Sequence, residues 1–310
     1  MLARVAERMY WFGRYMERAE NTARLVDVNG QLTLDLPQAA DVVWKFSTDV
    51  IDSTELFVSH YGQATERNVV RFMLADVRNP ASLATTVKFA RENVRSSREV
   101  LPSEAWEIVN NLHHFVDEHM QQAITRKNRP AFLDTVIGYS QRMVGLLSGT
   151  MSHTEGYRFI QLGRNIERAD MTSRIADMGA MELFGHRDRL TEAHDNILWT
   201  NVLRAISAYQ MFRQFSHDRI IGSDVVDFVF KDLWFPRSVM RCLAVMQQVM
   251  AHLPRNTEVE QEMRKTVAQL AKCNIETMDK EAMHVYITDL QLEIAHLHDR
   301  IATTWFSYPA

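Results

Sequence analysis

A short charged motif occurs twice in the chain, and its residue types are those that bind or transfer charge. Residues 13–18 read Gly-Arg-Tyr-Met-Glu-Arg, and residues 163–168 read Gly-Arg-Asn-Ile-Glu-Arg. Arginine guanidinium groups bind carboxylates and phosphates through two parallel hydrogen bonds. A neighbouring glutamate can act as an acid or a base, or bind an amine or a metal. The motif, called here the Glu-Arg motif, therefore makes Glu17 and Glu167 the candidate catalytic groups.

Nine arginines form the candidate set for binding a substrate or another anion. Six belong to the two copies of the motif and the helical turns after them, and three lie elsewhere: Arg14, Arg18, Arg24, Arg164, Arg168, Arg174, Arg91, Arg204 and Arg237. Arg91 stands in a charged run that a solvated helix face also explains. Arg237 follows Pro236 at an expected helix start, with Ser238 close to the capping position.

An architectural role for the same charges stays open beside the functional one. A catalytic carboxylate needs a raised pKa, whereas the adjacent arginines lower it. Glu20 and Arg24 are four residues apart, and such pairs contribute about 0.2–0.5 kcal/mol on an exposed helix. Pairs of so little value need not persist in both copies. We therefore expect a partly buried network in which each charge is paired, with the two charged helices near each other.

The residues around the motif have helical spacing in both copies. One stripe of residues 9–28 is apolar or small, and so is its counterpart in the second copy: Phe12, Met16, Ala19, Ala23 and Val26, then Leu162, Ile166, Ala169, Ser173 and Ala176. Such a stripe faces a core, and its small residues let another helix come close. A glycine inside a helix costs about 1 kcal/mol relative to alanine. Gly13 and Gly163 therefore indicate that a helix, an arginine or a ligand approaches the backbone there.

The repetition extends far beyond the motif itself. Residues 13–28 match 163–178 at an offset of 150, and residues 68–83 match 224–239 at an offset of 156. Between these blocks, an offset of 155 joins three pairs: Trp44 and Trp199, Ile51 and Ile206, Phe57 and Phe212. Because the three blocks keep their order, we interpret the chain as a tandem duplication. Two related halves usually pack about a pseudo-two-fold axis.

Helical periodicity runs along nearly the whole chain and breaks at proline, glycine and capping residues. We expect an all-α protein of about twelve helices. The two six-helix repeats, residues 1–150 and 151–310, are expected to form one compact unit. In the first repeat the expected helices cover residues 2–29, 38–60, 64–77, 82–100, 103–127 and 131–148. In the second they cover 154–185, 191–215, 223–235, a segment ending at 253, 257–279 and 280–306.

Composition and missing motifs exclude several classes of function. The formal charge of −4 argues against nucleic-acid binding, and no apolar run is long enough to span a membrane. Two cysteines without metal or redox spacing, and no signal peptide, favour the cytoplasm. Phosphate-binding, dinucleotide-binding and nucleophile motifs are absent, so we expect no cofactor.

Two groups of residues invite a metal interpretation, which the spacing does not support. His113, His114, Glu118 and His119 lie within two turns, and Glu293 and His296 have the Glu-x-x-His spacing of di-iron helix bundles. Those bundles need two such motifs and two further carboxylates, and the chain has one motif. We therefore expect no metal site.

Five segments spread along the chain resemble the bacterial alpha-E family of helical proteins, which is named for its Glu-Arg motif. The resemblance covers essentially the whole chain and rests on five segments, residues 10–26, 90–110, 156–175, 199–213 and 235–243. The family's two Glu-Arg pairs fall on Glu17-Arg18 and Glu167-Arg168. One departure is Tyr157, where a tryptophan is expected.

The resemblance implies work beside an amide-forming ligase. Family members are typically encoded beside, or fused to, a circularly permuted ATP-grasp protein and a transglutaminase-like peptidase. The resemblance therefore implies that this chain is a helical accessory protein of a ligase system that joins peptides. An anion or a peptide would bind between the two Glu-Arg helices. Two alternatives stay open: an enzyme that acts on a peptide or amino-acid-like substrate through the Arg/Glu cluster, and a purely structural scaffold.

Overall fold

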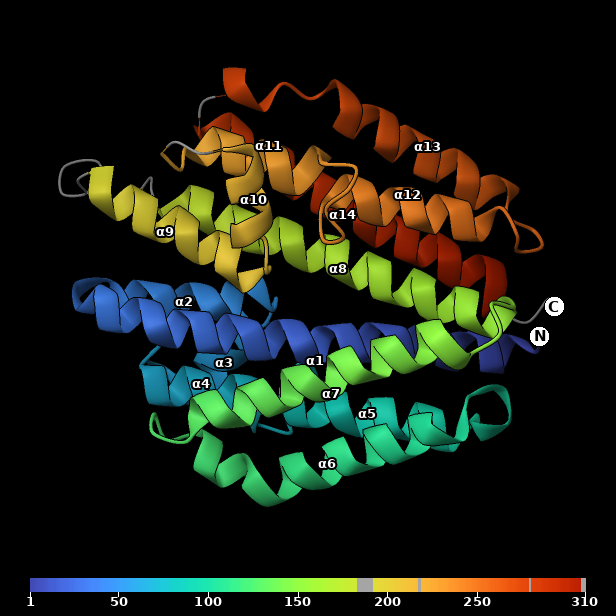
Figure 1. Cartoon of the computed structure of the whole chain (residues 1–310). Helices are drawn as coiled ribbons and strands as arrows, with labels where there is room; N and C mark the ends of the chain where they lie inside the picture. Colours follow the sequence, from blue (N-terminus) through green and yellow to red (C-terminus); the bar gives the residue numbers. More distant parts are fainter. Residues whose placement is uncertain (183–191, 217–218, 279, 308–310) are drawn as a thin grey trace. The chain divides into compact units, whose positions relative to one another are not determined.

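The computed structural model describes residues 1–182, 192–216, 219–278 and 280–307, and these residues are helical throughout their regular structure (Figure 1). They form fourteen α-helices and three short 3-10 helices, with no strand in these ranges. The all-α prediction is therefore confirmed. The chain divides into two compact units, Met1–Arg164 and Asn165–Ala310, which are described separately.

Seven α-helices come before residue 155 and seven from that residue on. The first seven are α1 (Ala3–Asp35), α2 (Ala40–Val50), α3 (Thr54–Tyr61), α4 (Glu66–Leu74), α5 (Leu83–Arg95), α6 (Ser103–Ala123) and α7 (Arg129–Thr150). The others are α8 (Glu155–Glu182), α9 (Glu192–Ala205), α10 (Tyr209–Phe215), α11 (Gly222–Lys231), α12 (Val239–Met250), α13 (Thr257–Lys272) and α14 (Lys280–Trp305). The short 3-10 helices are η1 (Pro37–Ala39), η2 (Arg98–Val100) and η3 (Ile275–Thr277).

The expected number of helices, about twelve, is too low because two expected helices are each broken once. The breaks lie at Asp52 and Ser207, whose φ angles of 53° and 58° are left-handed. Both turns close in the same way: Ser53 N donates to Thr48 O at 3.1 Å, and Ala208 N donates to Leu203 O at 2.6 Å. This is the bond pattern that ends helices at a left-handed residue, usually a glycine. Because neither residue is a glycine, the sequence gives no stop signal there.

Helix α1 continues six residues beyond the stop expected at Asn29-Gly30. Asn29 is fully buried, and its amide Nδ2 donates to Ser47 Oγ at 2.9 Å, so it contacts α2 rather than ending α1. Thr33 Oγ1 donates to the carbonyl of Gly30 at 3.1 Å. The expected boundary is therefore wrong: α1 ends at Asp35, shortly before Pro37, which cannot continue the helix.

In the first unit, four long helices pack in a closed ring. Each of α1, α5, α6 and α7 contacts two others, in the order α1–α5–α6–α7 and back to α1 (Figure 1). The apolar stripe expected on α1 faces this core: Phe12, Ala19, Ala23 and Val26 are fully buried. Helices α2 and α4 pack against α1 beside the ring. This is the layout of a four-helix bundle with a smaller helical layer on α1.

In the second unit, α11 is the element that joins the short helices to the long ones. It contacts α9, α12, α13 and η3, while α13 also packs against α12 and α14. Trp199 of α9 is buried, as expected, and two glycines make room for its ring. A Cβ added at Gly179 would lie 2.7 Å from Val202 and 3.0 Å from the Trp199 ring. A Cβ added at Gly222 would lie 2.5 Å from the indole nitrogen of Trp199.

The first turns of α8 belong to the first unit and touch α1 backbone to backbone. A Cβ on Gly13 would overlap the carbonyl of Ile160, and a Cβ on Gly163 would overlap the carbonyl of Tyr10. The contact is reciprocal, because the next nearest atoms are Arg164 N at 3.1 Å and Arg14 N at 3.2 Å. The sequence left open what approaches these glycines, and the answer is a helix.

A buried arginine ties α4 to the connection between α6 and α7. The Arg129 guanidinium donates to Glu66 Oε1 at 2.9 Å and to the carbonyls of Ala123 and Ile124 at 3.3 and 3.1 Å. Arg126 binds the same carboxylate from the solvent side. Burial opposes ionisation of Glu66, but the hydrogen bonds from Arg126 and Arg129 outweigh it and lower the pKa of this carboxyl.

We expect Gly13→Ala and Gly163→Ala each to destabilise the protein by about 3 kcal/mol or more, because the new methyl group meets a carbonyl held in a helix. Gly145→Ala is the matched control, since a Cβ at this α7 position meets nothing within 4 Å. It should be neutral or stabilising by up to about 1 kcal/mol. Urea unfolding followed by circular dichroism measures all three. Equal midpoints for Gly13→Ala and Gly145→Ala would contradict the close contact.

Arg129→Met should lower the free energy of unfolding by about 3 kcal/mol, because it leaves two helix-end carbonyls and a carboxylate without their shared donor. Arg126→Met is the control, since it removes a partner of the same carboxylate whose side chain is 65% exposed. The control should cost at most about 1 kcal/mol. Chemical denaturation of both variants tests the difference, and a larger loss for Arg126→Met would refute it.

The lowered pKa of Glu66 makes part of the stability pH-dependent. A carboxylate with a lower pKa in the folded state stabilises the fold above its unfolded pKa, and this contribution disappears as the pH falls through the folded value. The wild-type advantage over Glu66→Gln should thus be complete above the ordinary value of 4.5 and shrink below it. Unfolding curves of the two proteins between neutral and acid pH measure the difference in their free energies of unfolding. A difference that grows in acid would argue against this ion pair.

Candidate functional site

The first Glu-Arg motif lies on α1 and is largely buried. Glu17 is 2% exposed and Glu20 is 4% exposed, which agrees with the partly buried network that we expected. The half-buried Arg24 donates to Glu20 Oε1 through Nε at 3.0 Å and through Nη2 at 2.8 Å. Neither Glu17 nor Arg18 lacks a partner. Arg24 therefore holds the Glu20 carboxylate in an ion pair, and Glu17 has a partner of its own.

Arg14 lies beside aromatic rings on the same helix. Its guanidinium carbon is 4.9 Å from the Trp11 ring centroid and 5.9 Å from that of Tyr10. Trp11 stacks on Tyr15 at 5.4 Å, and Tyr15 packs against Phe89 of α5 at 5.6 Å. Such cation–π contacts hold the arginine by its flat face and leave the edge, which donates hydrogen bonds, for other partners.

The Glu167-Arg168 pair of the second Glu-Arg motif lies on α8 in the second unit, where the helix packs against the turn before α12. Glu167 is 1% exposed and Arg168 is 9% exposed. Arg168 Nη1 donates to the carbonyl of Pro236 at 3.3 Å, and Thr172 Oγ1 donates to the carbonyl of Arg237 at 2.9 Å. The structure thus brings together two segments that the sequence singled out separately, the motif and the turn that carries the buried Arg237.

The last arginine of each copy makes the same ion pair in its own unit. Arg174 Nε donates to Asp170 Oδ1 at 2.9 Å, four residues earlier, as Arg24 does to Glu20. Arg164 Nη2 donates to Gln161 Oε1 at 2.8 Å. These three candidate arginines therefore bind side chains of their own helix.

The three candidate arginines outside the motif occupy different surroundings. Arg91 Nε donates to Asn110 Oδ1 at 2.9 Å, and Arg91 and Arg98 both lie over Trp106, at 5.1 and 3.8 Å from its ring. Arg204 is exposed and lies 5.6 Å from the Tyr209 ring. Arg237 is buried beside the second motif. Arg91 therefore belongs to an arginine–tryptophan cluster between α5 and α6 that the sequence did not predict.

Two pairs of ionisable groups near the motif helices escaped sequence analysis. Asp177 of α8 lies 2.7 Å from His284 Nδ1 of α14; burial raises the pKa of Asp177, and His284 and Arg174 act against this. Burial, followed by the nearby Asp134, likewise raises the pKa of Asp27 on α1. The sequence separation of 107 residues between His284 and Asp177 explains why no spacing rule finds that pair.

The described residues do not bring together three or more side chains of the types that bind metals. His119 Nδ1 lies 3.0 Å from the Phe115 carbonyl, so this histidine has a backbone partner on its own helix. No helix in the described ranges is long and apolar enough to cross a membrane. A cavity that the sequence did not indicate lies beside α10 and α11 in the second unit.

Comparison with known proteins identifies the family but not an activity. Two curated relatives, uncharacterized proteins of Mycobacterium bovis and Mycobacterium tuberculosis, are each 24% identical over 191 residues. The match covers 53% of this chain and only 21% of each relative. No solved structure matches the chain. The Alpha-E family model, "a predicted alpha-helical domain with a conserved ER motif", matches residues 1–306. The chain therefore belongs to the Alpha-E family.

Proposed function

We propose that this protein is a non-catalytic helical partner of an ATP-grasp amide ligase and that the Glu-Arg motifs form its internal framework. The observation that carries the proposal is the burial of both motif glutamates, at 2% exposure for Glu17 and 1% for Glu167. A general acid or base must reach its substrate within hydrogen-bond distance. Carboxylates this deeply buried are better placed to hold helices than to meet a substrate.

The packing of the motif helix and the length of the relatives support the same proposal. The Gly13–Gly163 contact fills the space beside the first motif with backbone rather than with a ligand. In both mycobacterial relatives the matched segment is about a fifth of a longer chain. An Alpha-E segment within a longer chain fits a module that works beside others. The ligase itself, and a transglutaminase-like protein as a further partner, come from the family resemblance.

We also propose that the chain arose by duplication of a seven-helix unit. The order of helices supports this, since α1–α7 and α8–α14 follow one another with similar lengths. So do the left-handed breaks at Asp52 and Ser207, which lie 155 residues apart. Ser82 and Ser238, 156 residues apart, cap α5 and α12 through bonds of 3.3 and 3.1 Å to the backbone amide three residues on.

The two cysteines support a reducing, cytoplasmic location as part of this proposal. Cys242 is buried, Cys273 is partly exposed, and both are free thiols. Proteins in oxidising compartments commonly use their cysteines in disulfides.

The test is whether the full-length chain binds and activates the ligase. We expect the tagged protein to co-elute with a circularly permuted ATP-grasp ligase from the same organism and to raise its ATP turnover. Gly145→Ala should behave like the wild type, because this exposed α7 position has no neighbour within 4 Å. Absence of both a complex and any change in turnover would refute the proposal.

Glu17→Gln separates this framework role from the alternative, an enzyme that uses Glu17 or Glu167 as acid or base. If Glu17 is structural, the variant should unfold at a lower temperature, and its folded fraction should still stimulate the ligase. If it is catalytic, the melting temperature should stay the same while turnover of the substrate disappears.

A further inference from the structure

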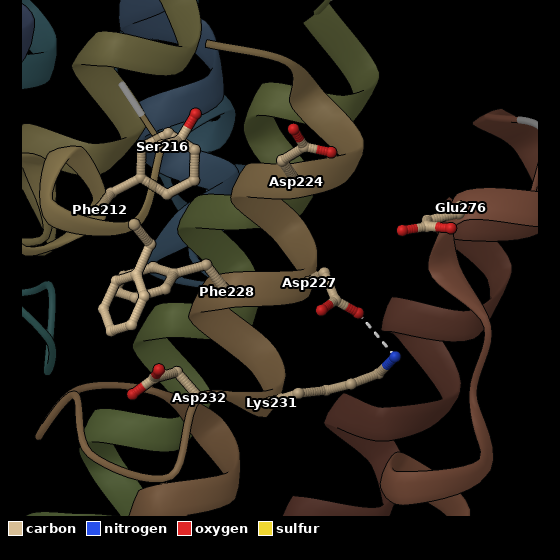
Figure 2. Close-up of a pocket in the computed structure, with 9 residues that line it drawn as sticks. Phe212, Ser216, Asp224, Asp227, Phe228, Lys231, Asp232 and Glu276 are labelled. Carbon is tan, nitrogen blue, oxygen red and sulfur yellow. Dashed lines mark ion pairs between the residues drawn. The ribbon is translucent and has the colours of Figure 1, made fainter. Parts of the chain in front are cut away.

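A cavity of about 360 Å³ opens in the second unit, and its walls are of two kinds (Figure 2). Aromatic rings form one side, and carboxylates with one lysine form the rest: Phe212, Phe215, Phe228, then Asp224, Asp227, Asp232, Glu276 and Lys231; Ser216 is the ninth lining residue. In Figure 2, Phe212 and Phe228 lie on the opposite side from Glu276. The volume falls within the range of about 300–1,000 Å³ that is usual for ligand pockets.

The corresponding residues of the first unit form a closed cluster around one tyrosine. Tyr61 stacks on Phe57 at 5.4 Å and meets the edge of Phe72 at 5.9 Å. Its hydroxyl donates to Asp76 Oδ2 at 2.8 Å. Arg78 closes the cluster, with Nη2 2.6 Å from the same oxygen and its guanidinium carbon 5.8 Å from the tyrosine ring.

The second unit has the same phenylalanine pair and the same aspartate turn, which together are called here the frame of the cluster. Phe212 and Phe228 meet edge to face at 5.5 Å and 73°, as Phe57 and Phe72 do at 5.2 Å and 71°. Asp232 accepts a bond from the backbone amide two residues on at 2.8 Å, as Asp76 does at 3.0 Å. The phenylalanine pair and the aspartate turn are therefore the same in the two units.

The second unit has different side chains at the two positions that fill the cluster in the first unit. The offsets of 155 and 156 residues place Ser216 where the first unit has Tyr61, and Trp234 where it has Arg78. Trp234 is 82% exposed and therefore leaves the cluster open. In the described part of the chain, the carboxylate of Asp232 accepts only from the backbone amides of Trp234 and Phe235.

Phe215 does not replace the missing tyrosine. Its ring lies 5.7 Å from that of Phe228, but the side chain is 66% exposed and carries no hydrogen-bond donor. It is one of the residues that line the cavity. Aromatic side chains such as Phe215 are enriched at protein-binding sites.

The net negative charge of the cavity lining indicates that its occupant carries a positive charge. Four carboxylates and one ammonium line it, and Lys231 is already paired with Asp227 at 2.6 Å. Asp224, Asp232 and Glu276 therefore favour a cation near the ring. In the first unit that cation is Arg78, 2.6 Å from Asp76 and over the Tyr61 ring.

We propose that this cavity docks a tyrosine side chain of a partner polypeptide, next to an arginine or lysine of the same segment. The ring stacks on Phe212 and meets the edge of Phe228, as Tyr61 does with Phe57 and Phe72; the hydroxyl donates to Asp232, and the basic side chain meets the remaining carboxylates. The occupant supplies from outside what Tyr61 and Arg78 supply within the first unit. The inference does not depend on the proposed ligase partnership.

Titration of the isotope-labelled full chain with the blocked dipeptide N-acetyl-Tyr-Arg-amide, followed by NMR, tests this docking. We expect saturable shifts at the backbone amides of Phe212, Phe228 and Asp232. N-acetyl-Phe-Arg-amide and N-acetyl-Tyr-Glu-amide should bind at least about fivefold more weakly, since each lacks one polar contact. Equal binding of all three, or no saturable shift, would overturn the proposal.

Two matched variants show whether the cavity itself is the site. Asp232→Asn keeps the oxygen that accepts the turn amides and should weaken Tyr-Arg binding about tenfold, as loss of a hydrogen bond to a charged group does. Asp76→Asn, the equivalent change in the first unit, should leave binding unchanged. The double variant Ser216→Tyr, Trp234→Arg should fill the cavity, abolish binding and leave the melting temperature equal or higher. Undiminished binding by this folded double variant would refute the site.

Discussion

The contact between Gly13 and Gly163 fixes how α1 meets the first turns of α8. Each glycine receives the carbonyl of the residue three positions before the other, Tyr10 or Ile160. No side chain fits between two backbones at this distance, so the register of one helix against the other cannot slip by a turn. Near this contact on α1, Phe12 is fully buried, and Glu17 and Glu20 are buried as well. The close approach of the two backbones at Gly13 and the burial of Glu17 and Glu20 therefore occur within two turns of α1.

What could be predicted from the sequence is what depends on neighbours along the chain. The apolar stripes of both motif helices and the cap at Ser82 follow from spacing and side-chain chemistry alone. The extent of α1 does not, because Asn29 stops a helix only if its amide lacks a better partner, and Ser47 supplies one. The left-handed breaks at Asp52 and Ser207 cannot be predicted from the sequence, and the reason is the same at both positions. A non-glycine residue in that conformation costs energy, which the surrounding packing must offset.

The candidate site shows the same division between local and distant information. Spacing predicted a buried, charged helix, and the pairs of Arg24 with Glu20 and Arg174 with Asp170 are within its reach. Partners that lie far apart in the chain are beyond it. Arg129 and Glu66 are 63 residues apart, and Arg168 reaches a carbonyl 68 residues away. The Glu-Arg spacing therefore predicts that the motif helix is buried, but not which distant segment it packs against.

The same frame of a phenylalanine pair and an aspartate turn is filled by Tyr61 and Arg78 in the first unit and borders a cavity in the second. A turn held by an aspartate needs only one carboxylate oxygen for the backbone amides, so Asp76 and Asp232 keep their turns whatever their other oxygen binds. The phenylalanine pair is buried in both units and fixes the distance between the two helices that carry it. Tyr61 and Arg78 do neither of these tasks. Their positions are therefore free to change without loss of the frame, and Ser216 and the outward-pointing Trp234 in the second unit leave the space beside the frame open.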